Sequence, residues 1–385
     1  MIDQQRIYLD YAATTPLDPA VAERMIEVIQ TVQGNPSSMY HEGRKARQVL
    51  DDARSCLATA LGCQFGEIIF TGSGTEAANQ AVVGTAFARR DGKRKRILVS
   101  AIEHHCVLHL REPLHALGYS LEFIPVSRDF VVNLECLQAM LDDDVLLVSV
   151  MAINNEVGSV QPTAEVSRLA RSVGALFHCD ITQSFGTDLM KGENICAKYD
   201  ADFLNASAHK IFGPKGIGFL YAKAGTKPKP IVFGGAQERE MRAGTENVVG
   251  IAGFAEAVRR MQQAEAKGEA RIARETFLAR LTEADLKFDV AVPEDSRSEH
   301  HAYLIFRGIR ADALIILLDR MGVSCSTGSA CSSGSMEPSH VLTAAGYGPE
   351  DAKSGVRFSF SHQVSKEEAE EAANRVVAAV RKLVQ

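Results

Sequence analysis

Seven short apolar runs alternate with longer helical stretches between residues 67 and 221, and this alternation limits the possible folds more than any other feature of the chain. The runs span residues 67–70, 97–100, 121–126, 145–153, 175–179, 201–205 and 218–221. Strands that are joined through helices pair in parallel, and the helices then cover both faces of the sheet. The sequence therefore predicts an α/β fold with a mostly parallel, seven-stranded sheet in a large domain.

A second, smaller α+β domain is expected in the last third of the chain. One long charged helical stretch covers residues 254–280, and short strand-like pieces follow at 302–306 and 355–359. A chain of 385 residues exceeds what one compact core usually holds. We therefore predict a large domain over residues 16–255, and a small domain formed by residues 1–15 and 256–385.

Composition and charge argue against several classes of protein. The formal net charge of −6 is unlike that of a dedicated nucleic-acid binder, which normally carries a basic excess. No apolar stretch reaches the ~18 residues needed to span a bilayer, and the N-terminus lacks the pattern of a signal peptide. Eight scattered cysteines without a CxxC pair fit reduced thiols better than a disulfide framework. We expect a soluble cytoplasmic protein with no membrane and no direct nucleic-acid partner.

Polar residues that suit a pyridine-type cofactor follow two of the predicted strands. Lys210 comes soon after the run 201–205, and a lysine that forms a Schiff base must lose its proton, which nearby positive charge or low polarity promotes. Asp180 follows the run 175–179 at a strand's carboxyl end, where it could salt-bridge a pyridinium nitrogen. Gln183 could hydrogen-bond the ring's phenolic oxygen. Taken alone, Lys210 could be an ordinary surface lysine, and Asp180 could equally be a helix cap.

Two further motifs follow predicted strands. Residues 72–76 read Gly-Ser-Gly-Thr-Glu before a helix, so close backbone approach and free N–H groups favour a phosphate there, although the motif is no P-loop. Residues 103–106 read Glu-His-His-Cys, and a flat imidazole at this strand end could stack on a cofactor ring and shuttle protons. The spacing of His105 and His109 would also suit a metal, but no acidic or thiol partner matches them, so no metal site is predicted.

Cys331 lies in the segment 325–339, which is rich in serine and glycine. Such a composition is typical of a mobile loop. A thiolate on such a loop could reach both a sulfur donor and a partner protein, and Cys325 is the nearest competing thiol. The segment is therefore the candidate site for a nucleophilic cysteine.

Together these motifs resemble those of the cysteine desulfurases of the NifS/IscS type, within the class-V aminotransferases. The resemblance covers nearly the whole chain, and the matching segments keep their order and spacing: YLDYAATTP, GNPSS, GTEAAN, IEHH, NNEVG, HCDITQSFG, SAHKIFGPKGIG, GGAQERE, RAGTENV and GSACSSGSMEPSHVL. It implies the PLP-dependent transferase fold (type I aminotransferase-like), with pyridoxal 5'-phosphate (PLP) as the cofactor.

The resemblance also implies a role for each matching residue. The expected catalytic residues are Lys210, which holds PLP and acts as a base, His104, which stacks on its ring, and Cys331, which becomes a persulfide. The expected cofactor-binding residues are Lys210, Gly74, Thr75, His104, Asn155, Asp180, Gln183, Ser207, His209 and, from the neighbouring subunit of a homodimer, Thr245. The expected substrate-binding residues are Asn35, Asn155 and Arg357. A guanidinium such as that of Arg357 suits a carboxylate because it bonds both oxygens at once.

The implied activity is the removal of sulfur from L-cysteine, which gives L-alanine and an enzyme persulfide on Cys331. The persulfide sulfur would pass to an acceptor such as an iron–sulfur cluster scaffold or a tRNA-thiolation protein. Departures from the family pattern include TGSGT at residues 71–75, where TSGGT or TSGAT is more usual, and Ala152, where histidine is common. The alternatives are a selenocysteine lyase or cysteine-sulfinate desulfinase, which share the cofactor site, and a non-catalytic interaction subunit.

Overall fold

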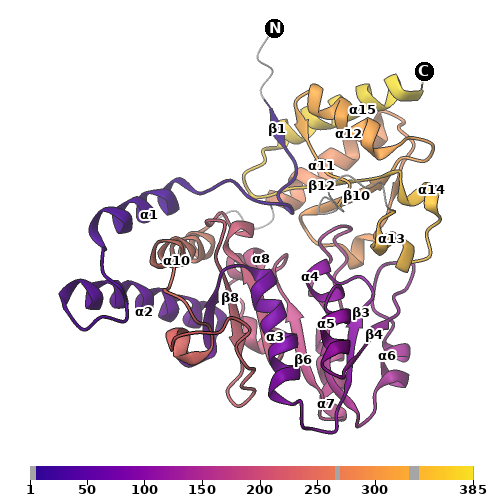
Figure 1. The fold of residues 1–385 in the computed structure, drawn as a ribbon. Coiled ribbons are helices and arrows are strands. Elements are labelled where there is room, and N and C mark those ends of the chain that lie inside the picture. Colours follow the sequence, from indigo (N-terminus) through magenta and orange to yellow (C-terminus); the bar gives the residue numbers. More distant parts are fainter. Residues whose placement is uncertain (1–5, 265–268, 329–337, 385) are drawn as a thin grey trace.

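The computed structural model describes residues 6–264, 269–328 and 338–384, and a seven-stranded sheet forms its larger part (Figure 1). The spatial order is β2-β8-β7-β6-β5-β3-β4, and β8 alone runs antiparallel to its neighbours in this sheet. The strands are β2 (Ile68–Thr71), β3 (Arg96–Ser100), β4 (Ser120–Ile124), β5 (Val145–Ser149), β6 (Leu176–Asp180), β7 (Phe203–Ser207) and β8 (Gly218–Ala222). The predicted mostly parallel sheet of seven strands is confirmed.

Helices cover both faces of this sheet, as its burial requires. Every residue of the central strands β5 and β7 is buried, and a strand buried on both faces needs cover on both. The helices of this larger part of the molecule are α1 (Pro19–Thr31), which packs on α10 rather than on the sheet, α2 (His41–Leu61), α3 (Gly74–Ala88), α4 (His105–Leu108), α5 (Arg111–Ala116), α6 (Leu134–Met140), α7 (Thr163–Ser172), α8 (Phe185–Lys191), α9 (Ile195–Tyr199) and α10 (Val248–Gln263). Short 3-10 turns lie at η1 (Phe65–Glu67), η2 (Ala208–Lys210) and η3 (Gln237–Glu240).

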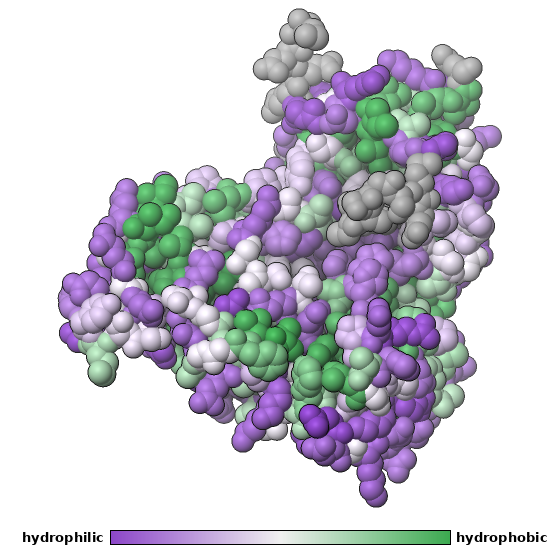
Figure 2. Space-filling model, viewed as in Figure 1, coloured by the Kyte–Doolittle hydropathy of each residue, from purple (hydrophilic) through white to green (hydrophobic). Residues whose placement is uncertain are grey.

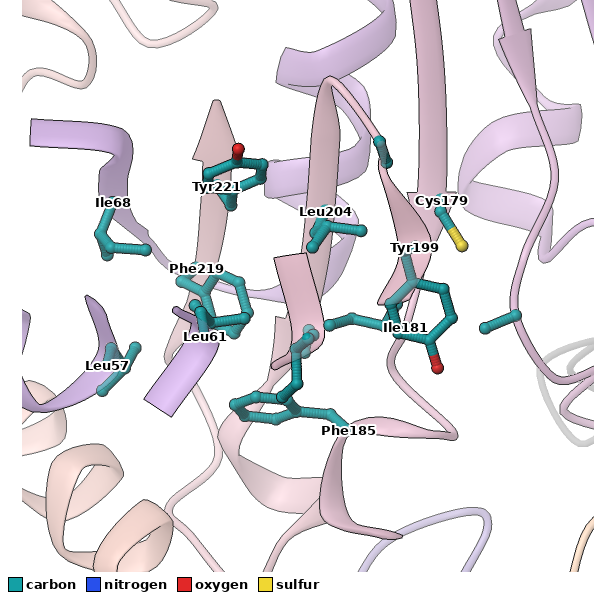
Figure 3. Close-up of a cluster of buried hydrophobic side chains, with 14 of the residues drawn as sticks. Leu57, Leu61, Ile68, Cys179, Ile181, Phe185, Tyr199, Leu204, Phe219 and Tyr221 are labelled. Carbon is teal, nitrogen blue, oxygen red and sulfur yellow. The ribbon is translucent and has the colours of Figure 1, made fainter. Parts of the chain in front are cut away.

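The largest apolar cluster lies between the sheet and helices α2 and α8 (Figure 3). Leu57 and Leu61 come from α2, Phe185 comes from α8, and Leu204 and Phe219 come from the sheet, all fully buried. Burial of one such side chain contributes about 1.5–3 kcal/mol. This packing fixes the strands whose carboxyl ends carry the candidate site.

A smaller three-stranded antiparallel sheet lies in the C-terminal part of the chain, in the order β12-β10-β9. Its strands are β9 (Asp289–Val290), β10 (His301–Ile305) and β12 (Gly355–Ser359), and the N-terminal β1 (Ile7–Tyr8) pairs in parallel with β11 (Val323–Ser324) close by. The helices here are α11 (Glu269–Glu283), α12 (Ala311–Arg320), α13 (His340–Ala344), α14 (Pro349–Ala352) and α15 (Lys366–Val384), with a 3-10 turn at η4 (Glu294–Ser296). The domain boundaries at residues 15 and 255 remain a prediction.

The single helical stretch expected over residues 254–280 is two helices, α10 and α11. Helix α10 ends at Gln263, because the next residue, Ala264, has an extended ψ of 119°. Phe254 of α10 belongs to the core of the large sheet, whereas Phe277 of α11 packs in the core of the smaller sheet. Both segments have a helical pattern, so the pattern alone did not show that the chain leaves the core of the large sheet and enters the core of the smaller sheet between them.

Three absences hold for the residues that the structure describes. None of their helices combines the length and the apolar character needed to cross a membrane. Their cysteines form no disulfide bond. No group of three or more His, Cys, Asp or Glu side chains among them is arranged to hold a metal ion.

Candidate active site

Four of the expected site residues lie at the carboxyl ends of parallel strands. Asp180 is the last residue of β6, Ser207 is the last residue of β7, and Lys210 ends the turn η2 directly after β7. His104 follows β3, two strands away from β6 in the same sheet. Ligands bind at this edge of open α/β sheets. The fold therefore gathers these side chains on the face where a cofactor is expected.

Lys210 and Gln183 meet at one carbonyl oxygen of the N-terminal segment. Lys210 Nζ donates to the carbonyl oxygens of Ala12, at 2.5 Å, and Ala13, at 2.9 Å, and Gln183 Nε2 donates to Ala12 O at 3.0 Å. Both side chains also line a cavity of about 420 Å³, together with Thr182. Residues 12–13 thus hold the amine of Lys210 beside the end of β6.

Asp180 is a buried acid whose charge acts on its neighbours. Its side chain is 7% exposed, and one carboxylate oxygen accepts the backbone N–H of Thr182 at 2.8 Å. It does not cap helix α8, which begins at Phe185 with Ser184 as its N-cap. The second carboxylate oxygen accepts no hydrogen bond from the described residues. It could therefore pair with a cationic ring nitrogen.

His104 is held as a neutral imidazole. It is the N-cap of α4, and its Nδ1 accepts the backbone N–H of Cys106 at 3.1 Å. Burial lowers the pKa of His104, and the charge of Lys210 lowers it further, against the opposing charge of Asp180. The proton of the neutral ring is therefore on Nε2, and the ring is a flat, uncharged surface close to Asp180 and Lys210.

The start of α3 and the end of β7 form a cradle that suits a phosphate. The backbone N–H of Gly74 donates to Ser207 Oγ at 2.7 Å, and a Cβ at Gly74 would lie only 2.9 Å from that oxygen. Ser73 caps the helix by accepting the N–H of Glu76 at 3.1 Å, and Thr75 is exposed at the helix start. Free N–H groups at a helix start favour anions.

His209 follows β7 and contacts Thr14, whereas Thr245 lines a different cavity. His209 Nδ1 is 3.1 Å from Thr14 Oγ1, and burial, with the charges of Lys210 and Lys215, lowers the pKa of His209 to about 4. Thr245 is exposed and lines a separate cavity that includes Gly72. The role of Thr245 in a neighbouring subunit, which the resemblance implies, remains a prediction.

Arg357 is a buried guanidinium that uses only part of its hydrogen-bonding capacity. It is 2% exposed, and it donates from Nη2 to Asp10 Oδ1 and from Nη1 to the carbonyl oxygen of Asn155, both at 2.6 Å. Its Nε has no partner among the described residues. Burial lowers the pKa of His301, and the charges of His300, Arg357 and Lys210 lower it further. Since buried polar groups are normally paired, the unused donor suits a carboxylate ligand.

One expected residue lies apart from this arrangement, and another falls outside the described residues. Asn35 is exposed in the loop between α1 and α2, at the end of the molecule away from the small sheet (Figure 1), where its Oδ1 accepts the N–H of Ser37 at 2.9 Å. Cys331 and the expected mobile loop around it fall largely outside the described residues. The described part of one chain therefore places Asn35 apart from Lys210.

Two buried acids beside the site received no role from the sequence. Glu103 is 0% exposed and Glu156 is 2% exposed, and they precede His104 and follow Asn155 respectively. The sequence signal that could have found them is an acidic residue among apolar or uncharged neighbours at the end of a predicted strand. Sequence alone cannot show that such an acid is buried, because helix and strand ends often carry exposed acids.

Glu103 should make the protein less stable as the pH rises. Its Oε1 accepts the N–H of Met151 at 2.5 Å and its Oε2 has no partner among the described residues. Burial, together with the charge of Asp180, raises the pKa of Glu103 to about 8. The unfolded chain loses this proton near pH 4.3, so from there to about pH 8 stability falls with rising pH, by up to about 1.4 kcal/mol per pH unit.

The substitution Glu103→Gln removes the group that binds this proton, and with it the contribution of Glu103 to the pH dependence of stability. The free energy of unfolding of the variant relative to the native protein should therefore increase from pH 5 to pH 8. Urea denaturation at four pH values measures it, with the exposed Glu135→Gln as the matched control. Parallel curves for Glu103→Gln and the native protein would show that Glu103 is ionised in the folded state.

The residues at this edge fit PLP. A lysine amine, a buried acid, a neutral imidazole and a cradle of helix N–H and hydroxyl groups match the aldehyde, the ring nitrogen, the ring face and the phosphate. The close approach at Gly74 and the unused oxygen and guanidinium donors of Asp180 and Arg357 are the structural observations behind this match. No feature of the described residues conflicts with it.

Comparison with known proteins identifies the family. The model of the family "Aminotransferase class-V" matches residues 7–371. A cysteine desulfurase IscS from Dictyoglomus turgidum is 38% identical, and the match covers 95% of this chain and 92% of that protein. A solved NifS-like protein has a TM-score of 0.89 and 31% identity, and the match covers 98% of this chain and 100% of the other. A structure titled "SspA in complex with cysteine" has a TM-score of 0.81 and 29% identity, with coverage of 92% and 98%.

The family match covers far more than half of the chain, and the relative is similar over nearly its full length. The fold and these similarities agree with one another. The chain therefore belongs to the class-V aminotransferase family, among the cysteine desulfurases of the IscS/NifS type.

Proposed function

We propose that the protein removes sulfur from L-cysteine, releases L-alanine and retains the sulfur as a persulfide on Cys331. The observation that carries this proposal is the meeting of Lys210, Asp180 and neutral His104 at one sheet edge. The buried guanidinium of Arg357 adds a binding group for the substrate carboxylate. The similarity to a named cysteine desulfurase and to a structure solved with cysteine supports this substrate.

The family implies PLP as the cofactor. Lys210 would hold its aldehyde, Asp180 its ring nitrogen, and Gln183 and Asn155 its polar ring substituents. The proposed phosphate ligands are Gly74, Thr75, Ser207, His209 and, from the neighbouring subunit, Thr245. When bound, PLP supplies an electron sink that stabilises negative charge at the substrate's α carbon.

The chain's own residues would then handle the carboxylate, the proton and the sulfur. Arg357 binds the substrate carboxylate, with Asn155 and, from another part of the dimer, Asn35 nearby. Lys210 takes the proton from the α carbon, since its amine is held at the edge of the cavity that it lines together with Gln183. The Cys331 thiolate attacks the substrate sulfur: an S–S bond forms, the substrate C–S bond breaks, and the carbon left behind is protonated to give alanine.

A homodimer with a sulfur acceptor as its further partner completes the proposal. Apolar side chains are exposed on and near α1 and α2 (Figure 2), and they include Ile26, Ile29, Met39 and Tyr40. Such patches mark interaction surfaces. The sulfur acceptor would be an iron–sulfur scaffold or a tRNA-thiolation protein. The protein would act in the cytoplasm.

The test is turnover by the PLP-loaded protein with L-cysteine, L-selenocysteine or cysteine sulfinate as the only substrate. We expect alanine from L-cysteine together with an equal amount of sulfur, recovered as persulfide or sulfide. Turnover of selenocysteine or cysteine sulfinate without turnover of cysteine would favour the lyase or desulfinase alternative. No turnover of any of the three would favour a non-catalytic subunit.

A further inference from the structure

Glu156 is a buried acid to which the proposed reaction gives no task. Its side chain is 2% exposed, and its backbone N–H donates to Asn154 Oδ1 at 2.9 Å. The preceding residue, Asn155, accepts a 2.6 Å hydrogen bond from Arg357 through its carbonyl oxygen. Glu156 therefore lies directly beside the proposed substrate site.

The chain just after the segment 329–337 is bonded to Glu156. Ser339 Oγ donates to Glu156 Oε2 at 2.6 Å, and the same Oγ accepts the N–H of Leu342 at 3.3 Å as the N-cap of α13. His340 Nδ1 lies 3.9 Å from Glu156 Oε1. The chain that follows residue 337 is thus fixed to this carboxylate.

The chain just before the segment packs on the same residue. Gly328 has a φ of +89°, and a Cβ at this position would lie 3.0 Å from the Cβ of Glu156. Its N–H donates to Ser326 Oγ at 3.1 Å, and Ser326 exchanges two backbone hydrogen bonds with Arg357, at 2.6 and 3.2 Å. The chain that precedes residue 329 is therefore fixed between Glu156 and the strand of Arg357.

We propose that Glu156 is a positioning residue. It holds the chain just before and just after the segment that carries Cys331, close to the strand that carries Arg357. The inference rests on the proposed function, because it takes Cys331 as the group that receives the sulfur. Fixing both ends of a short chain limits the volume in which its thiol moves. The thiol concentration at the substrate sulfur rises accordingly.

The acceptor role of Glu156 needs an oxygen but no charge. Burial raises the pKa of Glu156 to about 7, although the Ser339 hydrogen bond and the charge of Arg357 act to lower it. A glutamine side chain keeps an oxygen that can accept from Ser339. Glu156→Gln should therefore retain the function, whereas Glu156→Ala removes the acceptor.

The kinetic test uses the PLP-loaded enzyme and follows alanine formation from L-cysteine. We expect Glu156→Ala to lower kcat by up to about 100-fold, because a small displacement of a reacting group has effects of this size. The KM for cysteine should stay within about twofold, since Arg357 is left in place. Ser339→Ala should have a similar effect, and the double variant should be no worse than either single one. Glu156→Gln should be close to the native enzyme.

A structural test needs no turnover. Hydrogen–deuterium exchange should become faster at both ends, in the peptides that contain Gly328 and Leu342, when Glu156 is replaced by alanine. Ser339→Ala removes the same hydrogen bond and serves as the second variant if Glu156→Ala folds poorly. The exposed Glu135→Ala, in the first turn of α6, is the control and should change neither peptide.

Faster exchange at both ends, with a lower kcat and an unchanged KM, would support the inference. Faster exchange at the Leu342 end alone, or an unchanged kcat in an active enzyme, would overturn it. A failure of the proposed function is recognised separately, because the native enzyme would then form no alanine from cysteine.

Discussion

The substitution Lys210→Ala is expected to lower alanine formation from L-cysteine by at least about 1000-fold, because it removes both the attachment point of PLP and the base at the α carbon. Lys210 follows the end of β7, and its amine is held by the carbonyl oxygens of Ala12 and Ala13. Added amines should restore little activity, since that amine is fixed in position.

The measurement has two parts. Alanine is quantified with native and variant enzyme under saturating cysteine, and each protein is treated with borohydride in the presence of PLP before peptide mass analysis. The native protein should carry the reduced adduct on the peptide of Lys210, and the variant should carry none there. The exposed Lys229→Ala is the matched control and should keep both the adduct and the activity. An undiminished rate in Lys210→Ala would refute the assignment.

The architecture was predictable because a strand buried on both faces has a short run of consecutive apolar residues, which the sequence shows directly. The run at β5 is apolar at successive positions, and the strand is buried at every residue. The positions of Asp180 and Lys210 follow from the same pattern, since residues that come directly after parallel strands share one sheet edge. Local sequence and strand direction sufficed for these features.

Other features depend on contacts between distant parts of the chain, which no local pattern contains. Glu156 is buried because Gly328 and Ser339, more than 170 positions away, pack on it and bond it. The division of residues 254–280 into two helices follows from their packing in different cores. The expected role of Thr245 involves a second subunit, and Asn35, which was expected near the substrate, is exposed in the loop between α1 and α2 of one chain.

The protonation of the site was also beyond the sequence. His104 and Glu103 are adjacent in the chain, yet burial lowers the pKa of the first and raises that of the second. Both are therefore held in their neutral forms close to Asp180, which keeps the charges at this edge few in number. The size of a pKa shift depends on desolvation by the folded protein, which composition does not report.

Replacing Cys331 with serine should separate the handling of the amino acid from the handling of its sulfur. Cysteine should still bind, because Arg357 and Lys210 are untouched. Alanine formation should fall by at least about 1000-fold, as expected when a nucleophile is removed. A hydroxyl is a far weaker nucleophile than a thiolate near neutral pH, so serine cannot take over the attack on the substrate sulfur.

The measurement is mass analysis of alkylated peptides after incubation with L-cysteine, together with the alanine yield. The native enzyme should carry one extra sulfur on the peptide of Cys331, and Cys331→Ser should carry none. Cys325→Ala is the matched control, because burial raises the pKa of the Cys325 thiol and so keeps it protonated, and this variant should retain both signals. If the persulfide instead formed on Cys325, or if Cys331→Ser released alanine at the native rate, sulfur transfer would proceed without Cys331. The serine- and glycine-rich segment around position 331 would then need a different explanation.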